Sequence, residues 1–121
     1  MNKILIVDDT KEIRQIVKTT LDSEDYKVFE ASNGQKAVES ARKHKPDIII
    51  MDVVMPGGMD GIEATRQIKS DPETAHCKVI ILTGSESDRK KEGLEAGACD
   101  FFIKPFSPLD LLTKIEKLLD S

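Results

Sequence analysis

Short apolar runs alternate with longer amphipathic segments along the whole chain. The run Ile48–Asp52 is the strongest, because its four apolar residues are consecutive and end in a carboxylate. A continuous apolar run of this length predicts a strand covered on both faces, as in a parallel sheet with helices on either side. Four further short runs predict the remaining strands: Lys3–Val7, Tyr26–Ala31, Val79–Leu82 and Phe101–Ile103.

A segment with helical features follows each strand. The first helix follows Thr10 and has one apolar stripe: Ile13, Ile16, Val17 and Leu21. This spacing predicts that Arg14 and Lys18 face outward. The last helix is predicted to begin at the N-cap Ser107, and its stripe is Leu109, Leu112, Ile115 and Leu119. The three helices between them are bounded by turn residues and run from Gly34 to Pro46, Gly61 to Asp71 and Asp88 to Ala96.

The order of elements is therefore βα repeated five times. This order predicts an α/β fold with a doubly wound, five-stranded parallel sheet, five helices and right-handed crossovers. At 121 residues the chain has the length of one domain, residues 1–121. In such a sheet ligands bind at the carboxyl ends of the strands.

Composition narrows the class of partners. The chain is 39% hydrophobic and 33% charged with a net charge of -4, which describes a globular protein that nucleic-acid phosphates would repel. Only four apolar residues follow Lys3, so we expect no signal peptide, no membrane span and a cytoplasmic location.

The two cysteines, Cys77 and Cys99, form no CxxC pair. Two reduced thiols in a reducing compartment are the favoured interpretation. The alternative is a disulfide, because each cysteine lies just before a predicted strand, and neighbouring strands would bring them within about 4.4–6.8 Å between Cα atoms.

Chemically active side chains stand at four of the predicted strand ends. They are Asp8 and Asp9, Asp52, Thr83 and Lys104. Three carboxylates about 5 Å apart would repel by about 3 kcal/mol per pair at an effective dielectric constant near 20, so the site requires cations. One is Lys104, and a divalent ion would supply the rest. The available ligands are oxygens, which favour Mg²⁺, with Mn²⁺ as a substitute, over Zn²⁺.

Asp52 is the best candidate nucleophile because it stands alone on the central strand. A carboxylate beside a divalent cation, a lysine and a hydroxyl can attack a phosphoryl group in line. Asp8 and Asp9, as an adjacent pair, are better suited to holding the metal.

The chain resembles the receiver domain of two-component response regulators over its whole length, and is similar to the chemotaxis regulators among them. The resemblance rests on a set of short motifs in order: Asp8-Asp9, Met51-Asp52, Met55-Pro56, Met59-Asp60-Gly61, Leu82-Thr83-Gly84, Gly93-Leu94-Glu95-Ala96-Gly97-Ala98 and Lys104-Pro105-Phe106. It implies the flavodoxin-like strand order 2-1-3-4-5.

The resemblance also implies the functional roles. Asp52 would accept a phosphoryl group from a phosphohistidine on a sensor histidine kinase or a histidine phosphotransfer protein. Asp9, Asp52 and the backbone carbonyl of Val54 would hold Mg²⁺, with Asp8 acting largely through water. The domain would not be an enzyme in the usual sense, since it would catalyse only its own phosphorylation and slow autodephosphorylation.

Signal output is implied in the same way. Thr83 and Lys104 would bind the phosphoryl oxygens, and the rotamer of Phe101 would follow Thr83. This change would remodel the face made by the fourth helix, fifth strand and fifth helix. The downstream target is unknown, and a phosphorylation-dependent homodimer is one possible outcome.

Three local features refine the expectation. The loop Met55–Gly61 is one residue longer than the usual motif of the family. Val54 is apolar and cannot orient an attacking water, so we predict slow hydrolysis of the aspartyl phosphate. Residues 88–93 have almost no apolar side chain and contain Gly93, so we expect the fourth helix to be loosely anchored.

Other functions remain open on the sequence alone. A haloacid-dehalogenase-like phosphatase also uses an Asp nucleophile and Mg²⁺, but it normally needs Asp-x-Asp at one strand end, which neither acidic strand end provides. A flavodoxin-like cofactor binder would need a phosphate-binding loop where Asp8 and Asp9 stand. The last alternative is an interaction domain that is never phosphorylated.

Overall fold

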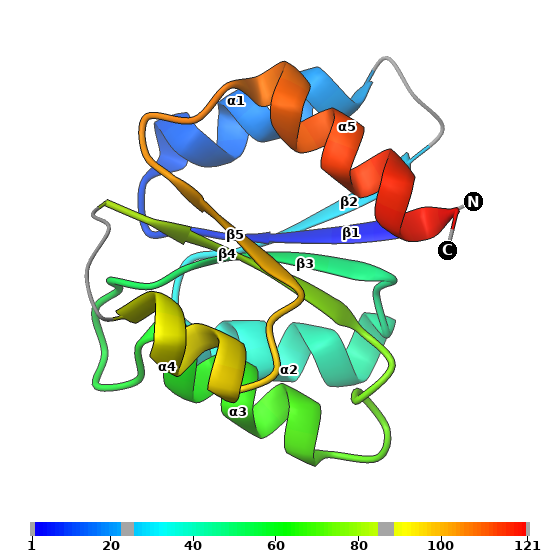
Figure 1. The fold of residues 1–121 in the computed structure, drawn as a ribbon. Helices are drawn as coiled ribbons and strands as arrows, with labels where there is room; N and C mark the ends of the chain where they lie inside the picture. The colour runs from blue at the N-terminus through cyan, green and yellow to red at the C-terminus, as the bar shows by residue number, and fades with distance from the viewer. Residues whose placement is uncertain (1, 23–25, 85–88, 121) are drawn as a thin grey trace.

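The computed structural model describes residues 2–22, 26–84 and 89–120, and strand and helix alternate along the chain (Figure 1). The strands are β1 (Asn2–Val7), β2 (Tyr26–Ala31), β3 (Ile48–Asp52), β4 (Lys78–Thr83) and β5 (Asp100–Ile103). The helices are α1 (Lys11–Asp22), α2 (Gly34–His44), α3 (Gly61–Ser70), α4 (Arg89–Glu95) and α5 (Pro108–Leu119). The predicted βα order is confirmed, and the predicted start of the fourth helix at Asp88 lies outside the described residues.

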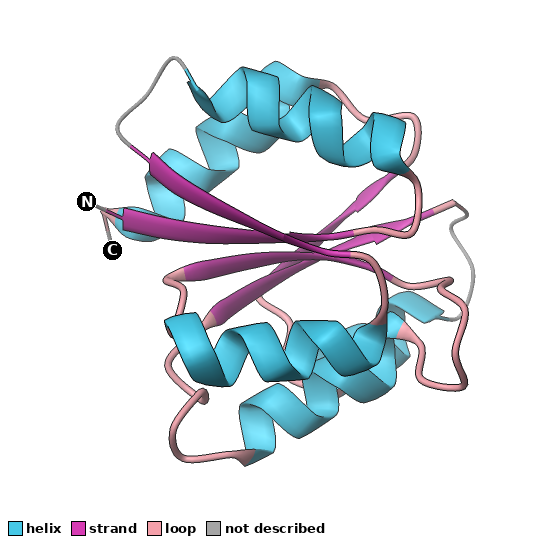
Figure 2. Ribbon diagram, turned by 180° about the vertical axis from the view of Figure 1, so that it is seen from behind, coloured by secondary structure: helices cyan, strands magenta, loops and turns pink. Residues whose placement is uncertain are grey.

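The five strands form one parallel sheet in the order β2-β1-β3-β4-β5. Helices α1 and α5 cover one face, and α2, α3 and α4 cover the other, as the front and back views both show (Figures 1 and 2). The predicted doubly wound sheet and its order are confirmed. Among the described residues, no helix has the length and apolar character needed to cross a bilayer.

Two apolar layers enclose the sheet, and the central strand contributes to both. Ile49 and Met51 belong to the layer under α2 and α3, whereas Ile48 and Ile50 belong to the layer under α1 and α5. All four side chains are fully buried. This double burial explains why β3 is continuously apolar rather than alternating.

The predicted helix faces need three corrections. Ile16 is exposed, because only the i, i+4 row through Val17 faces the sheet. Leu109 is 70% exposed in the first turn of α5, and Leu111 takes its place in the core. Arg14 does not face outward: its side chain is only 17% exposed and turns back toward the end of β1.

Side-chain caps fix where the helices begin. Asn33 accepts a hydrogen bond from the Lys36 amide at the start of α2, and Asp60 accepts one from the Glu63 amide at the start of α3. Ser107 caps α5 as predicted, accepting from the amide of the third helical residue. These caps fix the first turns of α2, α3 and α5.

The loop after β3 accommodates its extra residue because two of its glycines adopt positive φ angles. Gly57 and Gly58 have φ angles of 95° and 80°, a region that glycine enters without a steric penalty. The loop closes where the Gly61 amide donates to the Val53 carbonyl at 2.8 Å.

The disulfide alternative is not realised, because both cysteines are free. Although β4 and β5 are neighbours, the Cys99 amide bonds to the Val79 carbonyl, which lies two residues beyond Cys77. Cys77 is buried, and this burial raises the pKa of its thiol to about 11. Cys77 is therefore an unreactive core residue at neutral pH.

Gly61 offers a test of how tightly the chain packs behind Asp52. A Cβ at Gly61 would overlap the carbonyl oxygen of Asp52. We expect Gly61→Ala to lower the free energy of unfolding by about 3 kcal/mol in urea denaturation, because the two backbone segments must separate. Gly84→Ala is the control, since a Cβ there meets no atom of the described residues within 4 Å. Equal losses in the two variants would contradict this explanation.

Candidate functional site

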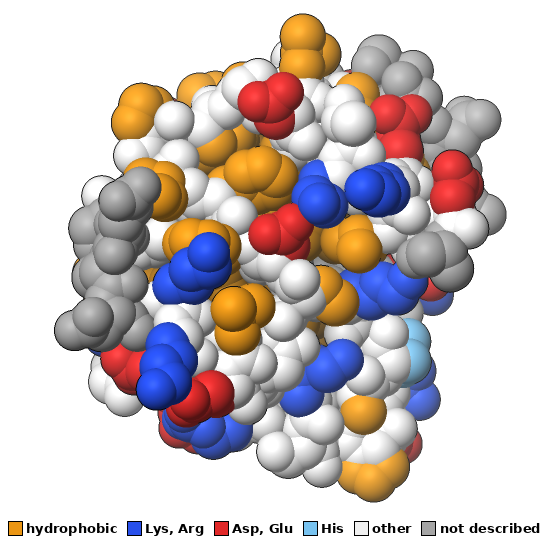
Figure 3. Space-filling view, in the orientation of Figure 1, with side chains coloured by type: hydrophobic (Ala, Val, Ile, Leu, Met, Phe, Trp, Pro, Cys, Tyr) orange, Lys and Arg blue, Asp and Glu red, His pale blue; other side chains and the backbone are white. Residues whose placement is uncertain are grey.

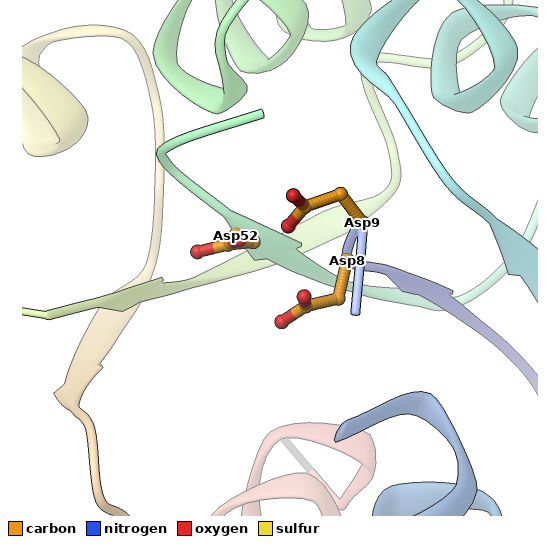
Figure 4. Close-up of side chains that lie close together, drawn as sticks. All are labelled: Asp8, Asp9 and Asp52. Atoms are coloured by element: carbon orange, nitrogen blue, oxygen red, sulfur yellow. The ribbon is translucent and has the colours of Figure 1, made fainter. Parts of the chain in front are cut away.

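The side chains singled out by the sequence gather at one edge of the sheet. Asp8 and Asp9 follow β1, Asp52 ends β3, Thr83 ends β4 and Lys104 follows β5. Figure 4 shows the carboxylates of Asp8, Asp9 and Asp52 side by side where β1 and β3 end. One carboxylate oxygen of each acid lies within 4.8 Å of the other two. The predicted convergence of the acids is confirmed.

Asp8 is held by hydrogen bonds of its carboxylate and of its backbone amide. It is fully buried, and its Oδ1 accepts the Thr10 amide at 2.9 Å. Its Oδ2 accepts Lys104 Nζ at 2.9 Å, and its own amide donates to the Ala31 carbonyl on β2. Asp8 is therefore a fixed member of the site.

Lys104 joins the outer and central strands of the site. Its Nζ lies 2.9 Å from Asp8 Oδ2 and 3.1 Å from Asp52 Oδ1. Its amide donates to the Thr83 carbonyl at 2.7 Å, which fixes where the side chain leaves the backbone. Burial lowers the pKa of Lys104, but its bonds to Asp8 and Asp52 outweigh burial and hold the pKa above the ordinary value, so the ammonium stays charged.

The ionised form of the Asp52 carboxylate is destabilised by its surroundings. Its side chain is nearly buried, and this burial, together with repulsion from Asp8 and to a lesser extent Asp9, raises its pKa to about 6. The interaction with Lys104 acts in the opposite direction and does not cancel the rise. A single lysine therefore does not compensate the three acids.

The donor set suits a hard divalent cation. The clustered atoms are carboxylate oxygens, and the group combines two buried acids with the exposed Asp9. A cation there would meet ligands of the type that Mg²⁺ prefers and would relieve the repulsion that raises the pKa of Asp52. The chemistry of the residues present thus fits a magnesium ion.

The two residues predicted to carry a switch lie in different surroundings. Thr83 is buried at the end of β4, beside the site. Phe101 on β5 packs against the layer under α2 and α3, and Lys90 Nζ from α4 lies 4.4 Å from its ring centroid. Phe101 thus contacts α4, outside the acidic cluster.

Helix α4, which the structure describes in full, buries little of its surface. Gly93 is the only buried residue among its seven. An ion pair of 2.6 Å joins Arg89 at its start to Asp60, the residue that caps α3. Among the described residues, the contacts of α4 include the buried Gly93, the Arg89–Asp60 pair and the contact of Lys90 with Phe101. Loose anchoring of this helix stays a prediction, which its single buried residue supports.

Two contacts of the site region were not predicted from the sequence. The Arg89–Asp60 pair joins residues 29 positions apart, and no local pattern indicates it. Arg14 was assigned to the solvent face, yet its Nη1 donates to the Asp8 carbonyl at 2.7 Å. A basic residue shortly after an acidic strand end is the only signal that could have suggested this contact.

The fold and the acidic strand ends together define a receiver domain. The chain belongs to the response regulator receiver domain family, whose model matches residues 4–116. The structural neighbours are receiver domains of chemotaxis and related regulators, and the curated relatives are response regulators.

Three similar proteins illustrate the range of this family. The phosphate regulon transcriptional regulatory protein PhoB of Pseudomonas aeruginosa is 41% identical over 96% of this chain and 51% of its own length. The chemotaxis response regulator CheY4 of Vibrio cholerae is 36% identical, with a TM-score of 0.89 over 98% of both chains. The receiver domain of the sensor histidine kinase PA1611 of P. aeruginosa has a TM-score of 0.89 and 30% identity over 99% of this chain and 98% of its own, and its structure has a magnesium ion coordinated in the active site cleft. The chain spans about half the length of the curated relatives it matches.

The raised pKa of Asp52 predicts a pH-dependent gain of stability in Asp52→Asn without divalent cations. Because the folded-state pKa is about 6 and the ordinary value is 3.8, the folded protein binds the proton more tightly, and wild-type stability falls as the pH rises through this window. We expect the variant to be more stable by about 1–3 kcal/mol above pH 6 and to lose this advantage below pH 4. Urea denaturation in EDTA at pH 4 and pH 7.5 measures it. An equal gain at both pH values would contradict the assignment.

Proposed function

We propose that this domain is the phosphoacceptor switch of a two-component phosphorelay and that Asp52 takes the phosphoryl group from a phosphohistidine. The observation that carries the proposal is the position of Asp52: a nearly buried carboxylate at the end of the central strand, 3.1 Å from Lys104 Nζ and clustered with two further acids. The family supports the same general role.

The chemistry follows from the two oxygens of Asp52. Lys104 holds Oδ1, and we assign the attack to Oδ2. A P–O bond forms to Oδ2 while the P–N bond of the phosphohistidine breaks, and the imidazole keeps the electron pair and takes up a proton. Lys104 would then bind a phosphoryl oxygen from the position it already occupies between Asp8 and Asp52.

Asp8, Asp9 and Asp52, with the backbone carbonyl of Val54, would hold Mg²⁺, with Asp8 acting largely through water. When bound, this ion supplies positive charge next to the transferred phosphoryl oxygens. Support comes from the oxygen cluster of this chain and from the magnesium ion coordinated in the related PA1611 receiver domain. Mn²⁺ is expected to substitute because it accepts the same oxygen ligands.

Thr83 and Phe101 would relay the change. Thr83 stands at the end of β4, where its hydroxyl could bind a phosphoryl oxygen, and Phe101 lies on the adjacent strand beneath α4. A movement of Thr83 toward the phosphoryl group would leave space for Phe101 to turn inward. Since α4 buries only Gly93, this helix can follow at little cost.

The face formed by α4, β5 and α5 is the proposed output surface. Figure 3 shows cationic and acidic side chains interspersed with apolar ones on this side of the molecule. Lys114 on α5 pairs with Asp100 on β5 at 2.8 Å, so the elements of the face are connected. A rearrangement of α4 would change the charge pattern that a partner meets.

The partners follow from this role. We expect a sensor histidine kinase or a histidine phosphotransfer protein as donor, a downstream target that binds the output face, and a homodimer that forms on phosphorylation. Direct binding of nucleic acid by this domain is not expected from its net charge of -4. A cytoplasmic location also remains a prediction. The only reactions assigned to the domain are its own phosphorylation and slow autodephosphorylation.

Acetyl phosphate tests the acceptor chemistry without the cognate kinase. We expect wild type to gain one phosphoryl group in intact mass spectrometry when Mg²⁺ is present and none in EDTA. Asp52→Asn, which keeps the size of the side chain, should gain none, whereas Asp110→Asn, an exposed acid in the first turn of α5, should behave as wild type.

Three outcomes would contradict the proposal. A phosphoryl group gained by Asp52→Asn would place the acceptor elsewhere. Repeated turnover of p-nitrophenyl phosphate by wild type, lost in Asp52→Asn, would favour the phosphatase alternative. Mg²⁺ binding without phosphorylation from acetyl phosphate or phosphorylated donor proteins would leave the interaction-domain alternative.

Val54 sets the predicted lifetime of the aspartyl phosphate. Its side chain is 74% exposed next to the acceptor and has no group that can orient water. We expect Val54→Asn to shorten the half-life several-fold, because an amide can hydrogen-bond the attacking water. Val54→Ala is the control for lost bulk, and the decay of the phosphorylated mass after removal of the donor gives the half-life. Equal half-lives in both variants would overturn the explanation.

A further inference from the structure

The end of β2 holds the main chain of Asp8 through two contacts. The Asp8 amide donates to the Ala31 carbonyl at 3.1 Å. The Asp8 carbonyl accepts Arg14 Nη1 at 2.7 Å, and Arg14 Nε donates to Glu30 Oε1 at 3.1 Å. Both polar groups of the Asp8 backbone are therefore tied, directly or through Arg14, to adjacent residues of one strand.

This arrangement controls the peptide that joins Asp8 to Asp9. The carbonyl of Asp8 is part of that peptide plane, so the guanidinium of Arg14 fixes how the plane is rotated. The plane in turn determines where the Asp9 side chain leaves the backbone. Asp8 has further bonds through its carboxylate, whereas Asp9 is the exposed member of the acid cluster.

The charge of Arg14 would not favour Mg²⁺ binding. A cation beside a site for a divalent cation opposes metal binding, and Glu30 only offsets this effect. The planar fork of an arginine, in contrast, can bond a carbonyl and a carboxylate at the same time. The geometry favours a positioning role over an electrostatic one.

We propose that Arg14, oriented by Glu30, is a positioning residue for Mg²⁺ binding: it fixes the Asp8–Asp9 peptide so that the Asp9 carboxylate faces the ion. This inference rests on the proposed function, because it assumes that the acid cluster binds Mg²⁺. Arg14 on α1 and Glu30 on β2 would then contribute to the Mg²⁺ affinity of the site, although its ligands lie at the ends of β1 and β3.

The test compares two variants with the same change of charge on α1. Arg14→Gln removes the guanidinium that bonds the Asp8 carbonyl and the Glu30 carboxylate. Lys18→Gln removes a cation one helical turn further along, 3.8 Å from the same Glu30 carboxylate. Calorimetry gives the dissociation constant for Mg²⁺, and circular dichroism during heating reports whether each variant is folded.

We expect Arg14→Gln to bind Mg²⁺ about tenfold more weakly, as is typical when a group that orients metal ligands is removed. Lys18→Gln should stay within about twofold of wild type, because exposed charges contribute little. A purely electrostatic role predicts the opposite sign, since the loss of a cation would tighten binding. An unchanged or tighter constant in Arg14→Gln would therefore overturn the inference.

Phosphorylation by acetyl phosphate supplies a second readout. In Arg14→Gln the Mg²⁺ concentration for half-maximal phosphorylation should rise about tenfold, and excess Mg²⁺ should restore the reaction. A general structural defect would instead lower the amount of phosphorylated protein even at saturating Mg²⁺, which would also count against the inference.

Arg14→Lys keeps the test decisive if Arg14→Gln does not fold. A lysine keeps the charge and one hydrogen bond but cannot bond the Asp8 carbonyl and the Glu30 carboxylate at the same time. Its dissociation constant for Mg²⁺ should therefore be several-fold higher than that of wild type and, where Arg14→Gln folds, lower than that of Arg14→Gln. Wild-type affinity in Arg14→Lys would overturn the positioning role. Failure of wild type to bind Mg²⁺ overturns the proposed function as well, whereas an Arg14 variant with normal affinity overturns only this inference.

Discussion

The structure depends on the way one ammonium group bridges two carboxylates at the edge of the sheet. Lys104 Nζ lies within 3.1 Å of both Asp8 and Asp52 and so connects residues 96 positions apart in the chain. One positive charge does not compensate three acids, and the pKa of Asp52 remains raised to about 6. The site thus carries an excess of negative charge. This excess favours the binding of a divalent cation, which phosphoryl transfer to Asp52 would require.

The parallel sheet makes this concentration of charge possible. Two apolar layers bury the central strands so completely that the backbone can hold like charges at its carboxyl edge. Tight packing continues behind the site, where the chain approaches Asp52 so closely at Gly61 that a side chain would not fit. In contrast, Gly93 is the only buried residue among the seven of α4. A rigid site next to a loosely held helix is the arrangement that a conformational switch requires.

The fold and the acid cluster were predictable because they depend on local patterns. Ile48–Asp52 indicates both a buried strand and a carboxylate at its end, and parallel pairing places the other strand ends beside it. Helix periodicity gave the buried rows but not their edges, so Ile16 and Leu109 were assigned to the core although they are exposed. The course of a long side chain is not encoded in periodicity at all. Arg14 therefore looked like a surface residue, and its bond to the Asp8 carbonyl is visible only in three dimensions.

The most direct test of the central claim is to locate the acyl phosphate itself. The protein would be phosphorylated in the presence of Mg²⁺ and treated with borohydride, which reduces an aspartyl phosphate to homoserine. Peptides would then be sequenced by tandem mass spectrometry. We predict homoserine at position 52 alone. Homoserine at position 8 or 9 would contradict the assignment of Asp52 as the acceptor and of the other two acids as metal ligands.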